Sequence, residues 1–158
     1  MYNAYVIVHF LLMLLWIVPA IVADDWFLAR FRRGGRDERI RVVKRIQALS
    51  GKTEMMASFF IPLVGVLLLV ERSFWLKEGI MHAKIVLALV AIGSYHAGRA
   101  RLRKLRNTLE SGDSTAGLPR RYMLLRSFTL LVLVVIVWLI VSFKGTFSTL
   151  YLIKSWFG

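Results

Sequence analysis

The stretch from Ile80 to Arg103, IMHAKIVLALVAIGSYHAGRARLR, decides the fold class of this chain. It lies within an apolar run from Gly79 to Gly98, which is long enough for a membrane-spanning helix, since a helix needs roughly 20 apolar residues to cross the hydrocarbon. The run ends in GRARLR, a group of arginines that marks one edge of a membrane. We therefore expect an integral membrane protein.

Three other segments have the same character, in a chain of 158 residues that is 58% hydrophobic. They cover residues 4–23, 55–70 and 127–143, and the second, which is shorter, still suffices when flanking residues reach the interface. Little chain remains outside these spans. The sequence thus predicts an all-α integral membrane four-helix bundle that forms one domain over residues 1–158.

The positive charge is concentrated in two loops, residues 30–52 and 99–126, which hold nine and eight of the 22 Lys and Arg residues. By the positive-inside rule both loops are cytoplasmic, so we expect an N-out/C-out protein of the inner membrane. A net charge of +13 could indicate nucleic acid, but the loops contain almost no aromatic residues for stacking bases. Anionic membrane lipid is the expected partner instead.

Residues 36–49 (RDERIRVVKRIQAL) have apolar side chains at spacings of three, which predicts an amphipathic helix lying along the inner membrane surface. After residue 98, GRARLRKLRN is expected to carry the third helix into water, followed by a turn-rich loop before Tyr122. The tail after Lys144 is expected at the outer interface.

Two histidines and a lysine interrupt the third span. Ionisable groups inside a membrane cost about 2.5 to 3.5 kcal/mol, so His82, Lys84 and His96 are candidates for function. The two histidines share a helix face but lie about 21 Å apart, so one metal cannot bind both. Lys84 is about 200° from His82, and it either reaches toward the outer interface or lines a pocket for a carboxylate.

His9 in the first span lies at the same depth as His82, within about 3 Å. Two imidazoles at one depth on facing helices are a candidate pair of haem-iron ligands, although polar contacts between helices would also explain them. Trp16 lies within about 20° of the face of His9 and could stack on a flat ring or simply pack. Met81 beside His82 leaves copper open as an alternative metal.

His96 could relay protons from Asp24 or Asp25, or pair with a carboxylate at the inner interface. The chain has no cysteine, which excludes disulfides, thiolate metal sites and thiol nucleophiles. It also lacks a glycine-rich phosphate loop, an HExxH motif and a paired-carboxylate motif. The usual sites of soluble enzymes are therefore missing as a set.

Several of these residues together form a pattern. His9 with Trp16 seven residues later, HAK at residues 82–84, SYH ending at His96, and RYMLLR before the fourth span resemble the HemJ family of membrane protoporphyrinogen oxidases. They resemble the membrane domain of CopD copper-resistance proteins more loosely. The resemblance covers nearly the whole chain, and the helix-three pattern is its most specific part.

The HemJ resemblance implies a haem-b-binding membrane redox protein that oxidises protoporphyrinogen IX and passes electrons to the respiratory chain. His9, His82 and Trp16 would then bind the haem, with His9 and His82 on its iron, and Lys84 and His96 would be the catalytic residues. Expected partners are a porphyrin-type ligand, respiratory-chain or haem-pathway membrane proteins, and a second copy of the chain. The alternatives are a CopD-like copper transporter and a non-catalytic membrane subunit or scaffold.

Overall fold

The computed structural model describes the backbone of residues 2–71 and 73–157, and the side chains within these ranges except at residues 2–3, 25, 28, 74–75, 141 and 143–157. Every element in this part of the chain is helical, which confirms the predicted all-α class. The elements are α1 (Tyr2–Phe31), α2 (Arg36–Leu49), the π-helix η1 (Ser50–Glu54), α3 (Met55–Glu71), the 3₁₀-helix η2 (Ser73–Lys77), α4 (Gly79–Ser111) and α5 (Leu118–Phe157).

Four of the described helical segments are long and apolar enough to cross a membrane, namely Ala4–Phe31, Arg36–Glu71, Gly79–Ser111 and Leu118–Ile140. Large apolar side chains cover their outward faces, as at Phe59, which is 67% exposed, and Leu89, which is 63% exposed. Such a surface is stable when lipid, rather than water, surrounds it. The chain is therefore a multi-pass membrane protein.

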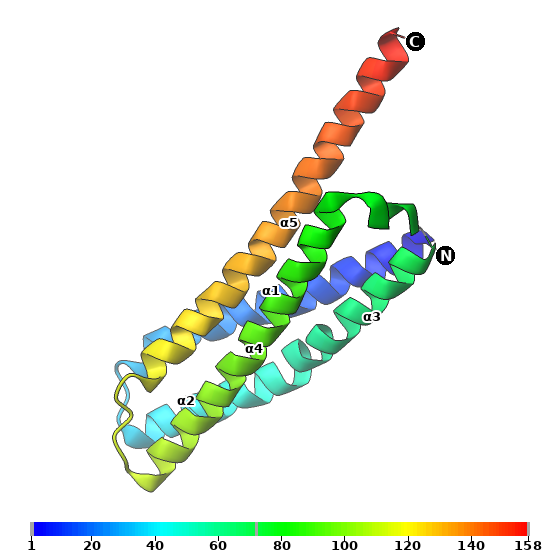
Figure 1. The fold of residues 1–158 in the computed structure, drawn as a ribbon. Helices are drawn as coiled ribbons and strands as arrows, with labels where there is room; N and C mark the ends of the chain where they lie inside the picture. Colours follow the sequence, from blue (N-terminus) through cyan, green and yellow to red (C-terminus); the bar gives the residue numbers. More distant parts are fainter. Residues whose placement is uncertain (1, 72, 158) are drawn as a thin grey trace.

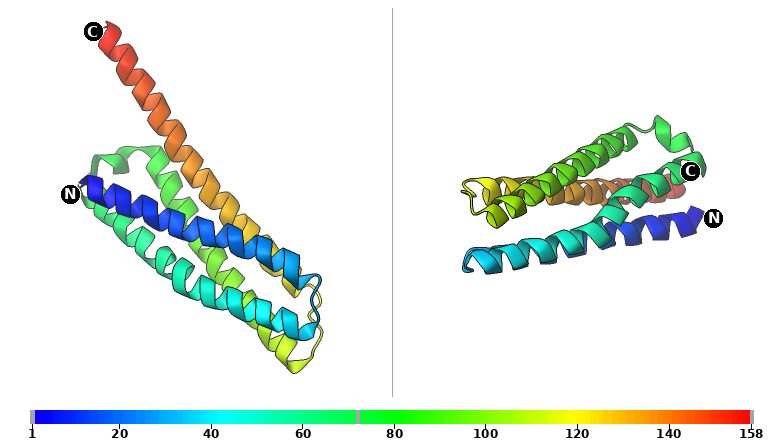
Figure 2. Two further views of the ribbon diagram at one scale, coloured as in Figure 1. Left: turned by 180° about the vertical axis from the view of Figure 1, so that it is seen from behind. Right: turned by 90° about the horizontal axis from the view of Figure 1, so that it is seen from below.

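The helices pair in two layers. Helix α1 packs along α3, α4 packs along α5, and α2 bridges α1 and α4 (Figures 1 and 2). The turn between α1 and α2 and the turn between α4 and α5 lie together at one end of the bundle (Figure 1). We call this end, which carries both arginine-rich segments, the basic end.

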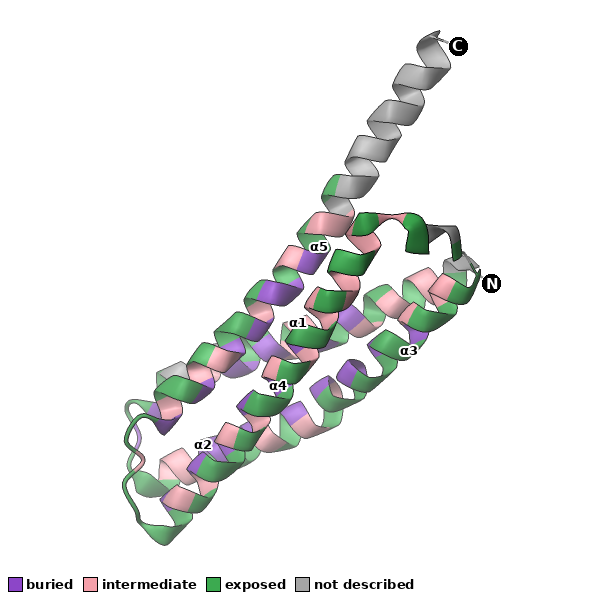
Figure 3. Ribbon diagram, in the orientation of Figure 1, coloured by how far each residue is buried: buried purple, intermediate pink, exposed green. Residues whose placement is uncertain are grey.

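Buried side chains form two apolar clusters at different heights in the bundle. The buried residues of the chain are the purple segments of the helices in Figure 3. The cluster at the basic end joins α1, α2, α4 and α5 through Phe27, Phe31, Val42, Val43, Ile46, Leu102, Leu105, Leu109, Leu118 and Tyr122. The middle cluster consists of Met13, Trp16, Ala57, Ile61, Ala91, Tyr95, Val132, Leu133 and Ile136. Polar side chains lie between these clusters.

The two predicted basic loops are largely helical, because α2 fills most of residues 30–52 while α4 and α5 extend into residues 99–126. The predicted helix over residues 36–49 is present, and its apolar face packs into the cluster at the basic end. Its predicted place along the inner membrane surface stays a prediction. Polar contacts also hold it to α4. The Arg36 guanidinium donates to the Leu109 and Glu110 carbonyls at 2.8 and 2.9 Å, and Lys44 pairs with Glu110 at 3.0 Å.

The join between α2 and α3 is a single π-helical segment, SGKTE. An extra residue in a helical turn rotates the following residues, and π-helical turns often occur at functional sites. In this structure both ends of the segment, Ser50 and Glu54, are buried. The π-helix therefore directs a hydroxyl and a carboxylate into the bundle.

The packing of α2 can be tested by removing one methylene group. Ile46 is fully buried, so Ile46→Val is expected to lower the free energy of unfolding by about 0.5 to 1.5 kcal/mol. Leu49→Val removes the same volume from a side chain that is 51% exposed, and it should change stability by less than about 0.5 kcal/mol. Unfolding midpoints in detergent compare the two variants, and equal losses would contradict a packed α2.

Candidate functional site

A buried ion cluster lies between the two apolar clusters. The Arg126 guanidinium on α5 donates from both terminal nitrogens to the two carboxylate oxygens of Glu54, one of them at 2.6 Å. Its Nε donates to Asp24 Oδ1 on α1 at 3.0 Å. One arginine thus connects three segments that are distant in the sequence, which we call the Arg126 cluster.

The side chains of the cluster are buried. The side chain of Arg126 is 5% exposed and that of Glu54 is 0% exposed. Charges in such a low-dielectric region are stable only when they are paired and hydrogen-bonded, because each loses its hydration. The bidentate geometry of arginine on a carboxylate provides this compensation at Glu54.

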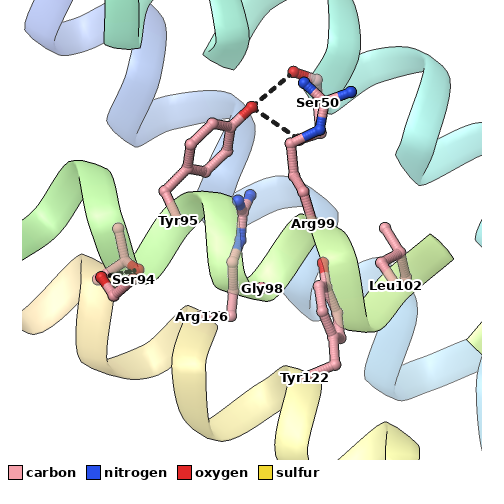
Figure 4. A pocket seen from close by; sticks show the side chains of 9 residues that line it. Ser50, Ser94, Tyr95, Gly98, Arg99, Leu102, Tyr122 and Arg126 are labelled. Atoms are coloured by element: carbon pink, nitrogen blue, oxygen red, sulfur yellow. Dashed lines mark hydrogen bonds between the residues drawn. The ribbon is translucent and has the colours of Figure 1, made fainter. Parts of the chain in front are cut away.

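Hydroxyl groups extend the cluster toward α4. The Tyr95 hydroxyl donates to the Ser50 carbonyl at 3.0 Å and lies 3.2 Å from Ser50 Oγ, which in turn lies 3.4 Å from Glu54 Oε2. Arg99 lies beside Tyr95 and Ser50 (Figure 4). A cavity of ≈ 10 Å³ between these side chains is about the size needed for one water molecule.

This arrangement provides fixed positive charge, two carboxylates and a phenol in the interior of the bundle. It can orient a water molecule or a proton, and it holds α1, η1, α4 and α5 in register. Among the described residues no group of three or more His, Cys, Asp or Glu side chains could hold a metal ion. The cluster is therefore a polar centre held by arginine.

The other notable polar group is His9, which lies nearer the opposite end of α1. Its half-buried imidazole packs against α3, with Cε1 3.6 Å from the place where a Cβ on Gly65 would lie. The ring also lies within hydrogen-bonding reach of the Ile61 backbone and within electrostatic reach of Lys84 on α4. In the described part of the chain, Nδ1 of His9 is buried with no hydrogen-bond partner.

The structure separates His82, Lys84 and His96, the three candidate residues of α4. Both histidines are exposed. Nδ1 of His82 lies 3.3 Å from the Glu78 carbonyl, and the His96 ring packs edge-on against the Tyr95 ring with 5.2 Å between the ring centroids. Lys84 is half-buried. The pairing of His9 with His82 on one haem iron remains a prediction, because in this structure it is Lys84 that lies near His9.

Helix geometry explains this result. The buried stripe of α4 passes through Ala91 and Tyr95. Lys84 is seven residues before Ala91 and lies within about 20° of that stripe, whereas His82 is nine residues before it and lies about 180° away. The face of α4 that carries His82 and His96 therefore points away from the core of the bundle.

Trp16 lies in the middle cluster rather than at a surface. It is 2% exposed, and its ring meets Tyr95 edge-to-face at 5.5 Å. Its Nε1 is buried with no hydrogen-bond partner among the described atoms, so α1 carries two such nitrogens, at His9 and Trp16. Asp24 belongs to the Arg126 cluster, and the side chain of Asp25 lies outside the described residues. The proton relay from either residue to His96 stays a prediction.

Sequence reasoning missed Arg126, Tyr95 and Ser50. It counted Arg126 with the basic loop, since the residue stands just before the apolar run. The available signal was its spacing, because Tyr122, Arg126, Thr129 and Leu133 follow one another at three or four residues and share a helix face. An arginine on the buried face of a membrane helix requires acidic partners, and Asp24 and Glu54 stand at comparable helix ends.

Comparisons with family models, with curated proteins and with solved structures found no match to this chain. Its class therefore follows from the fold and the site alone. It is a multi-pass helical membrane protein with an arginine–carboxylate cluster inside the bundle and a half-buried histidine on α1.

Proposed function

We propose that this protein is a haem-binding redox protein of the inner membrane, in the manner of the HemJ family that it resembles, with His9 as an iron ligand. The observation that supports this proposal is the buried and unpartnered Nδ1 of His9. A buried ring nitrogen without a partner costs free energy, and coordination by a metal would satisfy it.

Two neighbours of His9 support this proposal. Its ring lies in the bundle against Gly65, and the charge of Lys84 lies close enough to pair with a carboxylate of a porphyrin-type ligand. Haem would supply one-electron chemistry there when bound. His9 would hold the iron of the haem, and Lys84 would hold a carboxylate at the edge of the porphyrin.

The finer parts of the proposal rest on the resemblance and on charge. The substrate class is a porphyrinogen, the electrons leave to the respiratory chain, and the orientation is N-out/C-out because both arginine-rich segments lie at one end. His82 is the proposed second ligand, which requires α4 to present its opposite face. His96 keeps its proposed accessory role at the basic end.

The test is the absorption spectrum of the full chain purified in detergent, oxidised and then reduced with dithionite. We expect a sharp reduced haem band in the wild-type protein and its loss in His9→Ala. Phe10→Ala is the matched control, because Phe10 is the next residue of α1 and is 58% exposed. His82→Ala tests the second ligand separately.

A haem band that survives in His9→Ala would contradict the assignment of His9. Absence of any haem band after expression with ample haem would overturn the proposed function. Copper analysis of the same preparation would then test the CopD-like alternative. A wild-type fold without either metal would favour a non-catalytic membrane subunit.

A further inference from the structure

The hairpin of α1 and α2 at the basic end forms a cleft with an excess of positive charge. Trp26 and Arg30 line it from α1, and Glu38, Arg41, Val42 and Arg45 line it from α2. Its volume is ≈ 120 Å³, whereas a single water molecule needs about 10 to 15 Å³ by this measure. The cleft therefore has room for a small polyatomic group.

The walls of the cleft are fixed by the fold. Arg39 Nε donates to the Phe31 carbonyl at 3.1 Å and to the Gly34 carbonyl at 2.9 Å, which ties the end of α1 to the start of α2. Below the cleft, Val42 is 2% exposed in the cluster at the basic end. The spacing between the two helices is thus set by packing and does not depend on a ligand.

The arginines of α2 fall into two groups. Arg36 and Arg39, on one side, donate to backbone carbonyls. Among the described side chains, no carboxylate pairs with Arg41 or Arg45, and the Arg45 guanidinium instead stands over the Trp26 ring at 5.9 Å. A cation–π contact uses the face of a guanidinium and leaves its N–H groups available.

The one carboxylate of the cleft does not neutralise it. Glu38 pairs with Arg30 at 3.7 Å, beyond ordinary hydrogen-bond length, and both side chains are exposed. Three guanidinium groups against one carboxylate leave the cleft with a net positive charge. Arginine is suited to phosphate because its planar fork donates two parallel hydrogen bonds to a pair of oxygens.

The position of the cleft indicates where the phosphate comes from. Trp26 follows the apolar run of residues 4–23, and tryptophan at such a position lies at the level of the lipid headgroups. Basic pockets at this depth attract anionic headgroups more strongly than zwitterionic ones. We propose that this cleft binds one phosphate group, supplied by the headgroup of an anionic phospholipid or by free phosphate.

The experiment uses the full chain in neutral detergent, titrated with phosphatidylglycerol, with phosphatidylcholine and with sodium phosphate in turn. The shift in thermal midpoint with concentration gives an apparent affinity, since a ligand that binds only the folded state stabilises it. The cleft variant is Arg41→Gln/Arg45→Gln. The control is Arg32→Gln/Arg33→Gln, which removes the same charge from exposed residues outside the cleft.

We expect phosphatidylglycerol to bind the wild-type chain and the control alike, and to bind the cleft variant at least about tenfold more weakly, because charge-assisted hydrogen bonds are lost. The same dependence on Arg41 and Arg45 with sodium phosphate, but not with the lipid, would identify free phosphate as the source. Equal weakening of both variants would overturn the proposal, as it would show only general attraction to charge. If neither phosphatidylglycerol nor sodium phosphate bound the wild-type chain, the proposal would also be overturned.

Discussion

Arg126→Met is expected to lower the free energy of unfolding by about 3 to 5 kcal/mol, one of the two largest effects we predict for this chain. The substitution places a long apolar side chain at the same position and removes every donor that Glu54 receives from α5. Glu54 is 0% exposed, so its carboxylate would stay buried without compensation or would have to take up a proton. Unfolding by SDS titration in mixed micelles measures the loss.

Phe128→Met is the matched control. It introduces the same side chain two residues later on α5, where Phe128 is 46% exposed, and it should change stability by less than about 0.5 kcal/mol. If Arg126→Met were as stable as this control, the Arg126 cluster would not hold the bundle together. The positions of Asp24 and Glu54 would then need another explanation.

The existence of the four spans could be predicted from composition, because the thickness of a bilayer fixes the length of an apolar helix. The rotation of each helix about its axis could not be predicted in the same way. Lipid-facing and core-facing positions of a membrane helix are both apolar, so α4 shows little contrast between the stripe through Ala91 and the opposite face. The histidine face was therefore a reasonable candidate for the interior, and packing placed Lys84 inward instead.

Only part of the candidate site could be predicted from the sequence, for a related reason. His9 could be singled out because an imidazole in a membrane span is costly, and it does lie half-buried. The Arg126 cluster was hidden because each member stands near the end of an apolar run, where charges are ordinarily solvated. Only the convergence of α1, η1 and α5 makes these three charges a single buried unit.

The second large prediction removes the whole cluster. Asp24→Asn/Glu54→Met/Arg126→Met is expected to regain most of the stability that Arg126→Met alone loses, and to come within about 1 kcal/mol of the wild-type chain. Burying charges is costly even when they are paired, so uncharged side chains of similar volume, apolar at positions 54 and 126, can replace them at little net loss. The same SDS titration measures the difference, which reports the coupling among the three residues.

Glu54→Met alone is the informative comparison, because it leaves the Arg126 guanidinium buried with fewer acceptors and should lose about as much stability as Arg126→Met. A triple variant no more stable than either single variant would contradict this expectation. It would show that the attraction between the three charges exceeds the free-energy cost of burying them. A triple variant that regains stability but loses the haem band would separate the two roles. Because packing would then be intact, the charges of the cluster would be required for the proposed haem site and not for the fold.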